Sequence, residues 1–478
     1  MKKLKVGLVG TSQKSFPGDK KGAYEHSARG LDALSEKLGF ELVCYTNEVI
    51  NETDAMAAVD FFEECGIDFL LVQNTSYSAG FLAPVFAKIK NARVGLWAIR
   101  EGADDGVVPF NSLCSINMHQ SIIYHYLKAD NIKVKWFFGD VGEKRFVRRL
   151  AVTVRALTAI KNVCQSKVAL VGGIAPGFND LYNDERQFLK LFDGMKYNRL
   201  HEYDELKARA LAISDEQAAP VAERISAGAC GSGGCATKEL VLLSAKFYMA
   251  YTQFIAEYGY DAVAISCWPK FQEDFRFSAC SVIAQLNDDG IPAGCEGDVL
   301  STICMLLLKY ISNDITTLMD MAAFDEADQS VLMWHCGPAS SRFGKKYSLD
   351  GNYSGAPHIE GQSPIGVGVA RDMVFDPMPV TIFRLTGECD KYMLLNGTLM
   401  GDAKKSFKGS RGWMNNITMN NRPIGALDLV NTVQVTGFQH HYPMVPGDFS
   451  SECIEAAAWL GLKPLSSVPY ADYLQVID

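Results

Sequence analysis

The sequence predicts an α/β protein: two Rossmann-like parallel-sheet domains followed by a β-rich C-terminal domain. At 478 residues the chain is too long for one hydrophobic core, so several domains are expected. Apolar strands alternate with helical patterns over roughly the first two thirds of the chain. From Thr316 onward, short strands separated by Gly, Asn and Asp turns replace that alternation. We therefore place the domains at residues 1–160, 161–315 and 316–478.

The first domain has the alternation of a parallel sheet. Strands are predicted at Lys5–Gly10, Phe40–Tyr45, Phe69–Gln73 and Arg93–Ala98. Helices are predicted at Ala23–Leu38, Ala55–Cys65 and Ala83–Ile89. The loops at the carboxyl ends of such strands are where ligands usually bind.

A helical stretch over Ala151–Cys164 precedes the second domain, where the alternation resumes. Its predicted strands are Val168–Gly172, Tyr260–Ser266 and Ile291–Cys295, and its helices are Thr237–Glu257, Phe277–Leu286 and Val299–Tyr310. The third domain has predicted strands at Val331–Trp334, Val380–Leu385, Lys391–Asn396 and Leu427–Thr436, and a helix at Ser451–Leu460.

Bulk composition excludes several classes of protein. A net charge of −9 argues against nucleic-acid binding, which favours a basic surface. The basic and then apolar N-terminus is too short in its apolar part for a signal peptide, and no segment approaches the roughly 20 apolar residues of a membrane span. Thirteen scattered cysteines fit reduced thiols. We expect a cytoplasmic protein with no membrane partner.

Nucleotide-binding motifs do not fit. The glycines after the first strand are wrongly spaced for a dinucleotide fingerprint, and no Walker-type Gly-Lys-Ser/Thr occurs. Gln13, at the end of that first strand, could instead reach a sugar hydroxyl.

Two acidic residues lie in unusual settings. Glu296 follows an apolar strand, where burying a carboxylate is unfavourable unless a cation or another partner compensates. The alternative is that Glu296 or Asp298 caps the helix that begins at Val299. Asp320 lies among leucine and methionine, so it is either satisfied by a partner or placed for chemistry.

Histidines complete the candidate set. His335 ends a predicted strand before a Gly-Pro turn and is a core histidine, a ligand or a substrate contact. His440 and His441 are the only adjacent pair, and strand alternation predicts that at most one enters a site. Together, Glu296, Asp320 and a late histidine suit a divalent cation such as Mn²⁺ or Mg²⁺.

In order and spacing, these residues resemble the L-fucose isomerase and L-arabinose isomerase superfamily over the whole chain. The resemblance implies Mn²⁺, or another divalent cation such as Mg²⁺ or Co²⁺, bound by Glu296, Asp320 and His441, with His441 favoured over His440. The resemblance also implies that His335, Gln13 and Trp268 contact the substrate, with Gln13 reaching it across a subunit boundary. The sequence does not follow one branch of the superfamily throughout. The second acid matches the fucose branch and the histidine pair matches the arabinose branch, so the identity of the sugar stays open.

The resemblance implies an aldose–ketose isomerase, an intramolecular oxidoreductase, acting on a free monosaccharide such as L-fucose or D-arabinose. A carboxylate, Glu296 or Asp320, would move a proton between C2 and C1 through a cis-enediol while the metal binds O1 and O2. A homo-oligomer, trimer or hexamer, is also implied.

Two alternatives remain. One is an isomerase of a modified hexose such as sulfoquinovose, for which Lys14, Arg100 and Arg411 are the candidate sulfonate contacts. The other is a non-catalytic sugar-binding protein, which would lack the metal.

Overall fold

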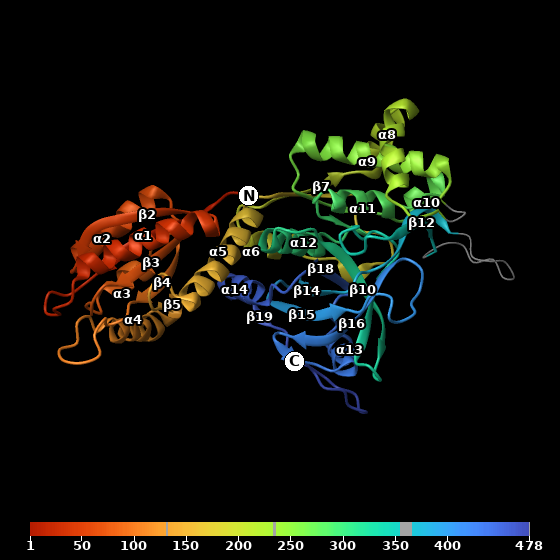
Figure 1. Ribbon diagram of the computed structural model, residues 1–478. Helices are drawn as coiled ribbons and strands as arrows, with labels where there is room; N and C mark the ends of the chain where they lie inside the picture. The colour runs from red at the N-terminus through yellow and green to blue at the C-terminus, as the bar shows by residue number, and fades with distance from the viewer. Residues whose placement is uncertain (131, 233–235, 354–365, 478) are drawn as a thin grey trace. The chain divides into compact units, whose positions relative to one another are not determined.

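The computed structural model describes residues 1–130, 132–232, 236–353 and 366–477 (Figure 1). The chain divides into two compact units, Met1–Lys161 and Asn162–Asp478, which are described separately. No helix in the described ranges is both long enough and apolar enough to cross a membrane.

Unit 1 contains a five-stranded parallel sheet in the order β2-β1-β3-β4-β5. Its strands are β1 (Leu4–Thr11), β2 (Phe40–Val49), β3 (Phe69–Asn74), β4 (Arg93–Ala98) and β5 (Val134–Phe138). Its helices are α1 (Lys20–Leu38), α2 (Glu52–Cys65), α3 (Leu82–Ala87), α4 (Ser112–Tyr126), the short η1 (Lys128–Asp130) and most of α5 (Lys144–Cys164), whose last three residues belong to unit 2. The central strand β3 is buried along its whole length, as expected for a parallel sheet covered on both faces.

Unit 2 begins with a four-stranded parallel sheet in the order β7-β6-β8-β9. The strands are β6 (Lys167–Val171), β7 (Lys196–His201), β8 (Ala262–Ile265) and β9 (Ala293–Gly294). The helices are η2 (Asn179–Leu181), α6 (Glu185–Leu191), α7 (Tyr203–Ala212), α8 (Asp215–Ala227), α9 (Lys238–Tyr258), α10 (Lys270–Phe275), α11 (Cys280–Asp288) and α12 (Val299–Ser312).

The rest of unit 2 is a barrel. Its strands pair in the order β16-β11-β10-β18-β14-β15, and β15 pairs with β16 to close the ring. The ring is formed by β10 (Thr317–Asp325), β11 (Ser330–His335), β14 (Met378–Leu385), β15 (Lys391–Leu399), β16 (Ser410–Met419) and β18 (His441–Pro446). Outside it lie β12 (Tyr347–Asn352), β13 (Val367–Val374), β17 (Arg422–Pro423), β19 (Lys463–Pro464), α13 (Ala426–Val435) and α14 (Ser450–Leu460).

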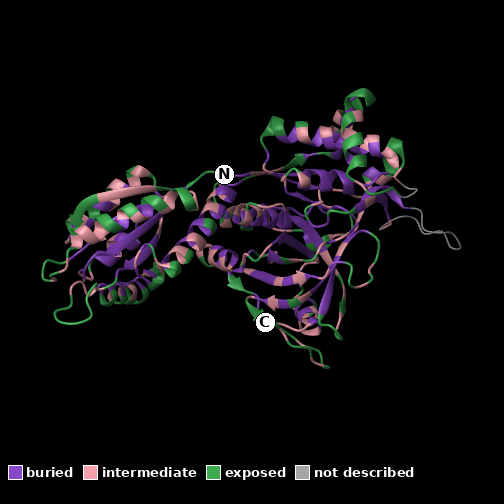
Figure 2. Ribbon diagram, viewed as in Figure 1, coloured by how far each residue is buried: buried purple, intermediate pink, exposed green. Residues whose placement is uncertain are grey.

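Helix α12 joins the two parts of unit 2. It contacts β6 and β8 of the parallel sheet as well as β14 and β18 of the barrel. Every residue from Val299 to Leu308 is buried, and Figure 2 shows the helix almost entirely buried. Any side chain at its N-terminus consequently lies between the sheet and the barrel.

The predicted fold class is confirmed, with one element wrong. Leu427–Thr436 was predicted as a strand and forms helix α13 instead. Its buried residues are Ala426, Leu429, Thr432 and Val433, which recur at helical spacing. The β-branched residues of this segment favoured a strand, but packing one helical face into the core decides the outcome.

Candidate metal centre

Glu296 occupies a constrained turn at the carboxyl edge of the parallel sheet. It follows β9, and its backbone lies in the left-handed region at φ 60°. Its carbonyl accepts a hydrogen bond from the Ala175 N–H (2.9 Å), and the next residue, Gly297, donates to the Ile265 carbonyl (3.0 Å). A Cβ at Gly297 would lie 2.3 Å from the Gly173 carbonyl oxygen, so only glycine fits. Non-glycine residues at positive φ concentrate at functional sites, where the surrounding structure enforces them.

Asp298 does not face the centre but supports it. Its Oδ1 accepts from the Ser301 N–H (2.9 Å), which caps α12 as the alternative interpretation of the sequence predicted. Its Oδ2 lies 2.9 Å from His441 Nδ1 and 3.2 Å from Arg384 Nη1. All three side chains are fully buried. Burial would raise the pKa of Asp298, but Arg384 and His441 hold it well below its usual range.

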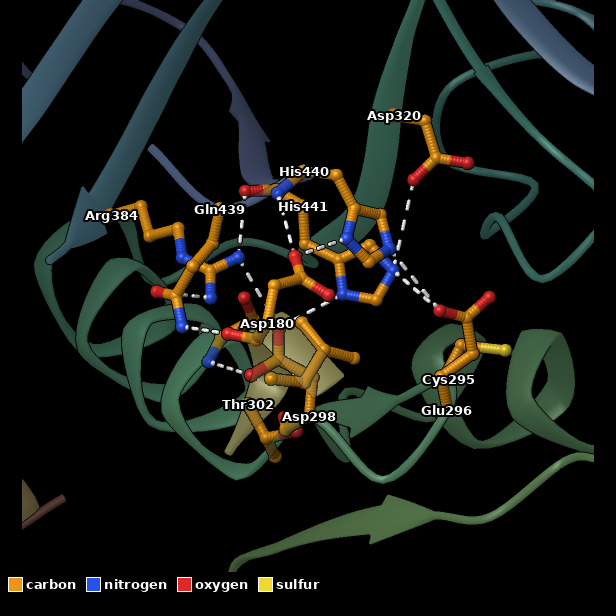
Figure 3. A network of polar contacts seen from close by, with 12 residues as sticks. Asp180, Cys295, Glu296, Asp298, Thr302, Asp320, Arg384, Gln439, His440 and His441 are labelled. Atoms are coloured by element: carbon orange, nitrogen blue, oxygen red, sulfur yellow. Dashed lines mark hydrogen bonds and ion pairs between the residues drawn. The ribbon is translucent and has the colours of Figure 1, made fainter. Parts of the chain in front are cut away.

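His441 and Asp320 meet through strand pairing. They are directly opposite each other in the antiparallel pair β10–β18. Because the His441 Nδ1–H donates to Asp298, its Nε2 points toward Glu296 Oε2 (3.3 Å) and Asp320 Oδ1 (3.7 Å) (Figure 3).

The structure brings both late histidines to this centre, so the prediction that at most one would enter is wrong. His440 Nε2 lies 3.3 Å from Glu296 Oε2, and its Nδ1 lies 2.6 Å from Asp180 Oδ2. Strand alternation does not apply to this pair, because β18 begins only at His441. His440 is 37% exposed in its side chain, whereas His441 is fully buried.

His335 enters from the end of β11. Its ring stacks on that of His441 with centroids 5.7 Å apart. The backbone N–H of Cys336 donates to its Nδ1 (2.9 Å), which leaves the proton of a neutral ring on Nε2. That buried Nε2 has no hydrogen-bond partner in the described part of the chain. His335 is therefore better suited to donating a hydrogen bond to a ligand oxygen than to binding a metal.

Hydrogen-bond acceptors face one another in the centre, and no described residue places a donor between them. His440 and His441 each direct Nδ1 to a carboxylate, so each neutral ring presents a lone pair toward Glu296, which is also an acceptor. Asp320 Oδ1 and His441 Nε2 are buried and make no hydrogen bond within the described ranges. Either an added proton or a cation resolves this arrangement.

The pKa values of Glu296, Asp320 and His441 are all shifted by this crowding of buried polar groups. Burial would raise the pKa of Glu296, but the imidazoles of His440 and His441, each with Nε2 3.3 Å from Glu296 Oε2, hold it at about 2. Burial raises the pKa of Asp320. Burial would lower the pKa of His441, but Asp298 and Glu296 raise it to about 9.

The donor set fits a divalent cation. Ligand atoms of Asp320, His440 and His441 lie within 4.8 Å of one another, and Glu296 Oε2 lies 3.3 Å from Nε2 of both histidines. Carboxylate oxygens with imidazole nitrogens suit ions of the Mn²⁺ type. The structure thus contains groups that could bind the predicted metal.

The other two predicted substrate contacts are Trp268 and Gln13, and the role of each stays a prediction. Trp268 is half-buried just after β8, the strand that neighbours β9, so it lies at the same sheet edge as Glu296. Gln13 is exposed after β1 in unit 1, and its part in the site stays a prediction.

Three polar residues around the centre had no predicted role in it: Asp180, Asp298 and Arg384. The resemblance to known isomerases ranks His440 behind His441 as the candidate ligand. Arg384 had a detectable signal, because a lone cation within the apolar strand Val380–Leu385 requires a buried partner. Asp180 lies in the loop after β6, and nothing in its sequence context marks it.

Comparison with known proteins indicates the enzyme class. No protein-family model matches the chain. It is 26% identical over 402 residues to the sulfoquinovose isomerase of Priestia megaterium, covering 83% of this chain and 85% of that enzyme. The sulfoquinovose isomerase of Alkalicoccus urumqiensis is 25% identical over 399 residues, with 81% and 83% coverage. That of a Clostridium species is 23% identical over 449 residues, with 92% and 94% coverage.

Among solved structures, a solute-binding protein from Thermotoga lettingae in complex with 5-methylthioribose matches with a TM-score of 0.17. It is 13% identical, over 66% of this chain and 75% of that one, which is too weak a likeness to support any argument.

The similarity to these relatives supports membership of a sugar isomerase family. The chain is an aldose–ketose isomerase, an intramolecular oxidoreductase, which confirms the predicted enzyme class. The finer resemblance to L-fucose and L-arabinose isomerases stays a prediction.

Proposed function

We propose that the chain is a metal-dependent isomerase of sulfoquinovose, with its active site at the centre formed by Glu296, Asp320 and His441. The observation that carries this proposal is the similarity to sulfoquinovose isomerases across more than four fifths of the chain. It favours the modified-hexose alternative over L-fucose or D-arabinose.

Glu296, Asp320 and His441 would hold the divalent cation, with His440 as the further candidate ligand. When bound, such an ion polarises adjacent sugar oxygens and stabilises negative charge. Asp298 fixes the His441 ring so that Nε2 faces the centre, and Asp180 does the same for His440.

The proton transfers are assigned to the two carboxylates. One oxygen each of Glu296 and Asp320 faces the imidazoles, at 3.3 and 3.7 Å from His441 Nε2. The other oxygen remains available as a base. One carboxylate removes the C2 proton of the open-chain aldose, O1 takes up a proton to give the cis-enediol, and a proton then returns to C1 as O2 loses its own. The His335 Nε2–H donates a hydrogen bond to a sugar oxygen.

A sulfonate requires a cation that is not already paired. Arg100 is bound by Glu143 through two hydrogen bonds, and Arg411 is paired with Asp372. Lys14 is exposed and makes no ion pair within the described ranges. Because it follows Gln13, we assign Lys14 as the sulfonate contact, in a homo-oligomer in which unit 1 of one copy would serve the site of another.

The test is a substrate panel with chelator-treated and Mn²⁺-loaded protein. Sulfoquinovose should be converted to its ketose with solvent deuterium incorporated at C1, and L-fucose, D-arabinose and D-glucose should be converted far more slowly. Faster turnover of L-fucose or D-arabinose would overturn the substrate assignment. Turnover that is indifferent to exhaustive chelation would overturn the metal-dependent site.

Variants locate the site and the sulfonate contact. Glu296→Gln and Asp320→Asn should each lower kcat by about 10²–10⁴-fold with folding intact. Glu326→Gln, an exposed acid in the turn after β10, is the matched control and should be unaffected. Lys14→Gln should raise KM for sulfoquinovose but not for D-glucose, whereas Lys37→Gln, an exposed lysine at the end of α1, should change neither.

A further inference from the structure

Four cysteines from four separate elements of unit 2 gather beside the metal centre. Cys267 follows β8, Cys280 begins α11, Cys295 follows β9, and Cys336 follows β11. None of them has a role in the proton transfer proposed above.

Their sulfur atoms form one continuous group. Cys295 Sγ lies 3.1 Å from Cys267 Sγ, and Cys280 Sγ lies 3.4 Å from Cys336 Sγ. Cys295 and Cys336 link the two pairs, because their sulfurs and a ring nitrogen of His335 all lie within 4.8 Å of one another.

Hydrogen-bond donors also point into this group. Ser278 Oγ donates to Cys280 Sγ (2.8 Å), and Asn352 Nδ2 lies 3.4 Å from the same sulfur. Cys280 is 1% exposed and Cys295 is fully buried. The neighbouring Cys336 sulfur and burial raise the pKa of Cys280 well above its ordinary value, although Ser278 lowers it, so Cys280 binds a metal only by releasing its proton.

The distances favour a shared cation over two disulfides. Zinc–sulfur bonds of about 2.3 Å in a tetrahedron place sulfurs about 3.8 Å apart. The two close pairs would have to separate by about 0.4–0.7 Å to reach that spacing, and Cys295 and Cys336, within 4.8 Å of each other, would have to approach by at most about 1 Å. Two disulfide bonds, at about 2.05 Å, would require each pair to close by more than about 1 Å.

We propose that Cys267, Cys280, Cys295 and Cys336 form a second metal site, for a soft divalent cation such as Zn²⁺. Each thiol releases its proton on binding. Four thiolates fill a tetrahedral ion, so the site is structural, with no position left for substrate.

Ligand chemistry distinguishes this site from the carboxylate–imidazole centre, which it adjoins at His335. Thiolates select soft ions, whereas carboxylates suit Mn²⁺. Figure 3 shows the Cys295 sulfur directed away from the rings of His440 and His441. The ion would tie together the segments that carry Trp268, Glu296 and His335, and so hold the active site in shape.

The direct test is zinc K-edge X-ray absorption on the reduced full-length protein loaded with one equivalent of Zn²⁺ in excess Mn²⁺. The expected first shell is four sulfurs at about 2.3 Å. A shell of nitrogen and oxygen alone, or disulfides in the freshly purified protein under non-reducing mass spectrometry, would overturn the proposal. This measurement needs no variant and does not depend on isomerase activity.

Cadmium provides the residue-level test, because sulfur-to-cadmium charge transfer gives an ultraviolet band that oxygen ligands do not. Wild-type protein should develop this band on Cd²⁺ titration. Cys280→Ser should weaken Cd²⁺ binding by more than the 10–100-fold typical of losing an outer partner. Cys453→Ser, buried in α14, is the matched control and should leave the band unchanged. An unchanged band in Cys280→Ser would contradict the assignment.

Discussion

Replacing Asp298 by asparagine tests how the centre is held together. Asp298 is fully buried, and its Oδ2 neutralises Arg384 and orients His441. The variant preserves the size of the side chain and keeps an oxygen that can cap α12. It removes only the negative charge, so both the stability of unit 2 and the affinity for the metal should fall.

The magnitude follows from what Arg384 retains. Breaking a buried ion pair by removing one partner typically costs about 3–5 kcal/mol. Arg384 still donates to the His441 carbonyl (3.0 Å) and to Gln439 Oε1 (2.8 Å), so we expect the lower end, about 3 kcal/mol. That corresponds to a Tm lowered by roughly 5–10 °C. Loss of the carboxylate that orients His441 should also weaken Mn²⁺ binding by about 10–100-fold.

Two assays measure these effects: calorimetric unfolding of the chelated protein and Mn²⁺ titration followed by electron paramagnetic resonance. Asp314→Asn is the control, because its ion pair with the half-exposed Arg342 should be worth less than about 1 kcal/mol. If the Asp298→Asn variant has the Tm and the Mn²⁺ affinity of the wild type, the orienting role of Asp298 is refuted.

Three further predictions concern the histidines, the acid limb of stability and the metal. His441→Gln should abolish Mn²⁺ binding, whereas His440→Gln, at a position that is 37% exposed, should weaken it only about tenfold; equal losses in the same titration would contradict this order. Burial would raise the pKa of Asp288, but Arg371 holds it below its ordinary value. The ionised Asp288 therefore stabilises the fold above about pH 4, and this contribution is lost as the pH falls further. In Asp288→Asn the free energy of unfolding should fall less steeply below pH 4 than in the wild type. An unchanged slope would refute this role. Finally, Mn²⁺ affinity should rise from pH 6 to pH 8, because the ion and a proton compete for His441 Nε2; affinity that is independent of pH would contradict that competition.

Parts of the site could be predicted because burying an ionised carboxylate among apolar residues is energetically unfavourable. Glu296 at the end of a buried strand and Asp320 among leucine and methionine each require a compensating partner, and that need is visible in one sequence. The parallel-sheet elements were likewise predictable from their periodicity. Strand β4 was placed at Arg93–Ala98, as observed.

The remaining parts depend on contacts between distant segments. Asp180 reaches His440 across 260 positions of the chain, and nothing local to Asp180 indicates that partner. Likewise, Asp298 orients His441 only because the barrel places β18 against the N-terminus of α12. Local sequence indicates that a carboxylate is out of place, but the tertiary fold selects its partner.

The most direct test of the metal-dependent site is anomalous diffraction at the manganese edge from crystals grown with Mn²⁺. We predict one peak per chain, within bonding distance of a single oxygen of Glu296, a single oxygen of Asp320 and Nε2 of His441. A peak at another location, or a centre closed by direct contacts among these side chains under saturating Mn²⁺, would contradict it.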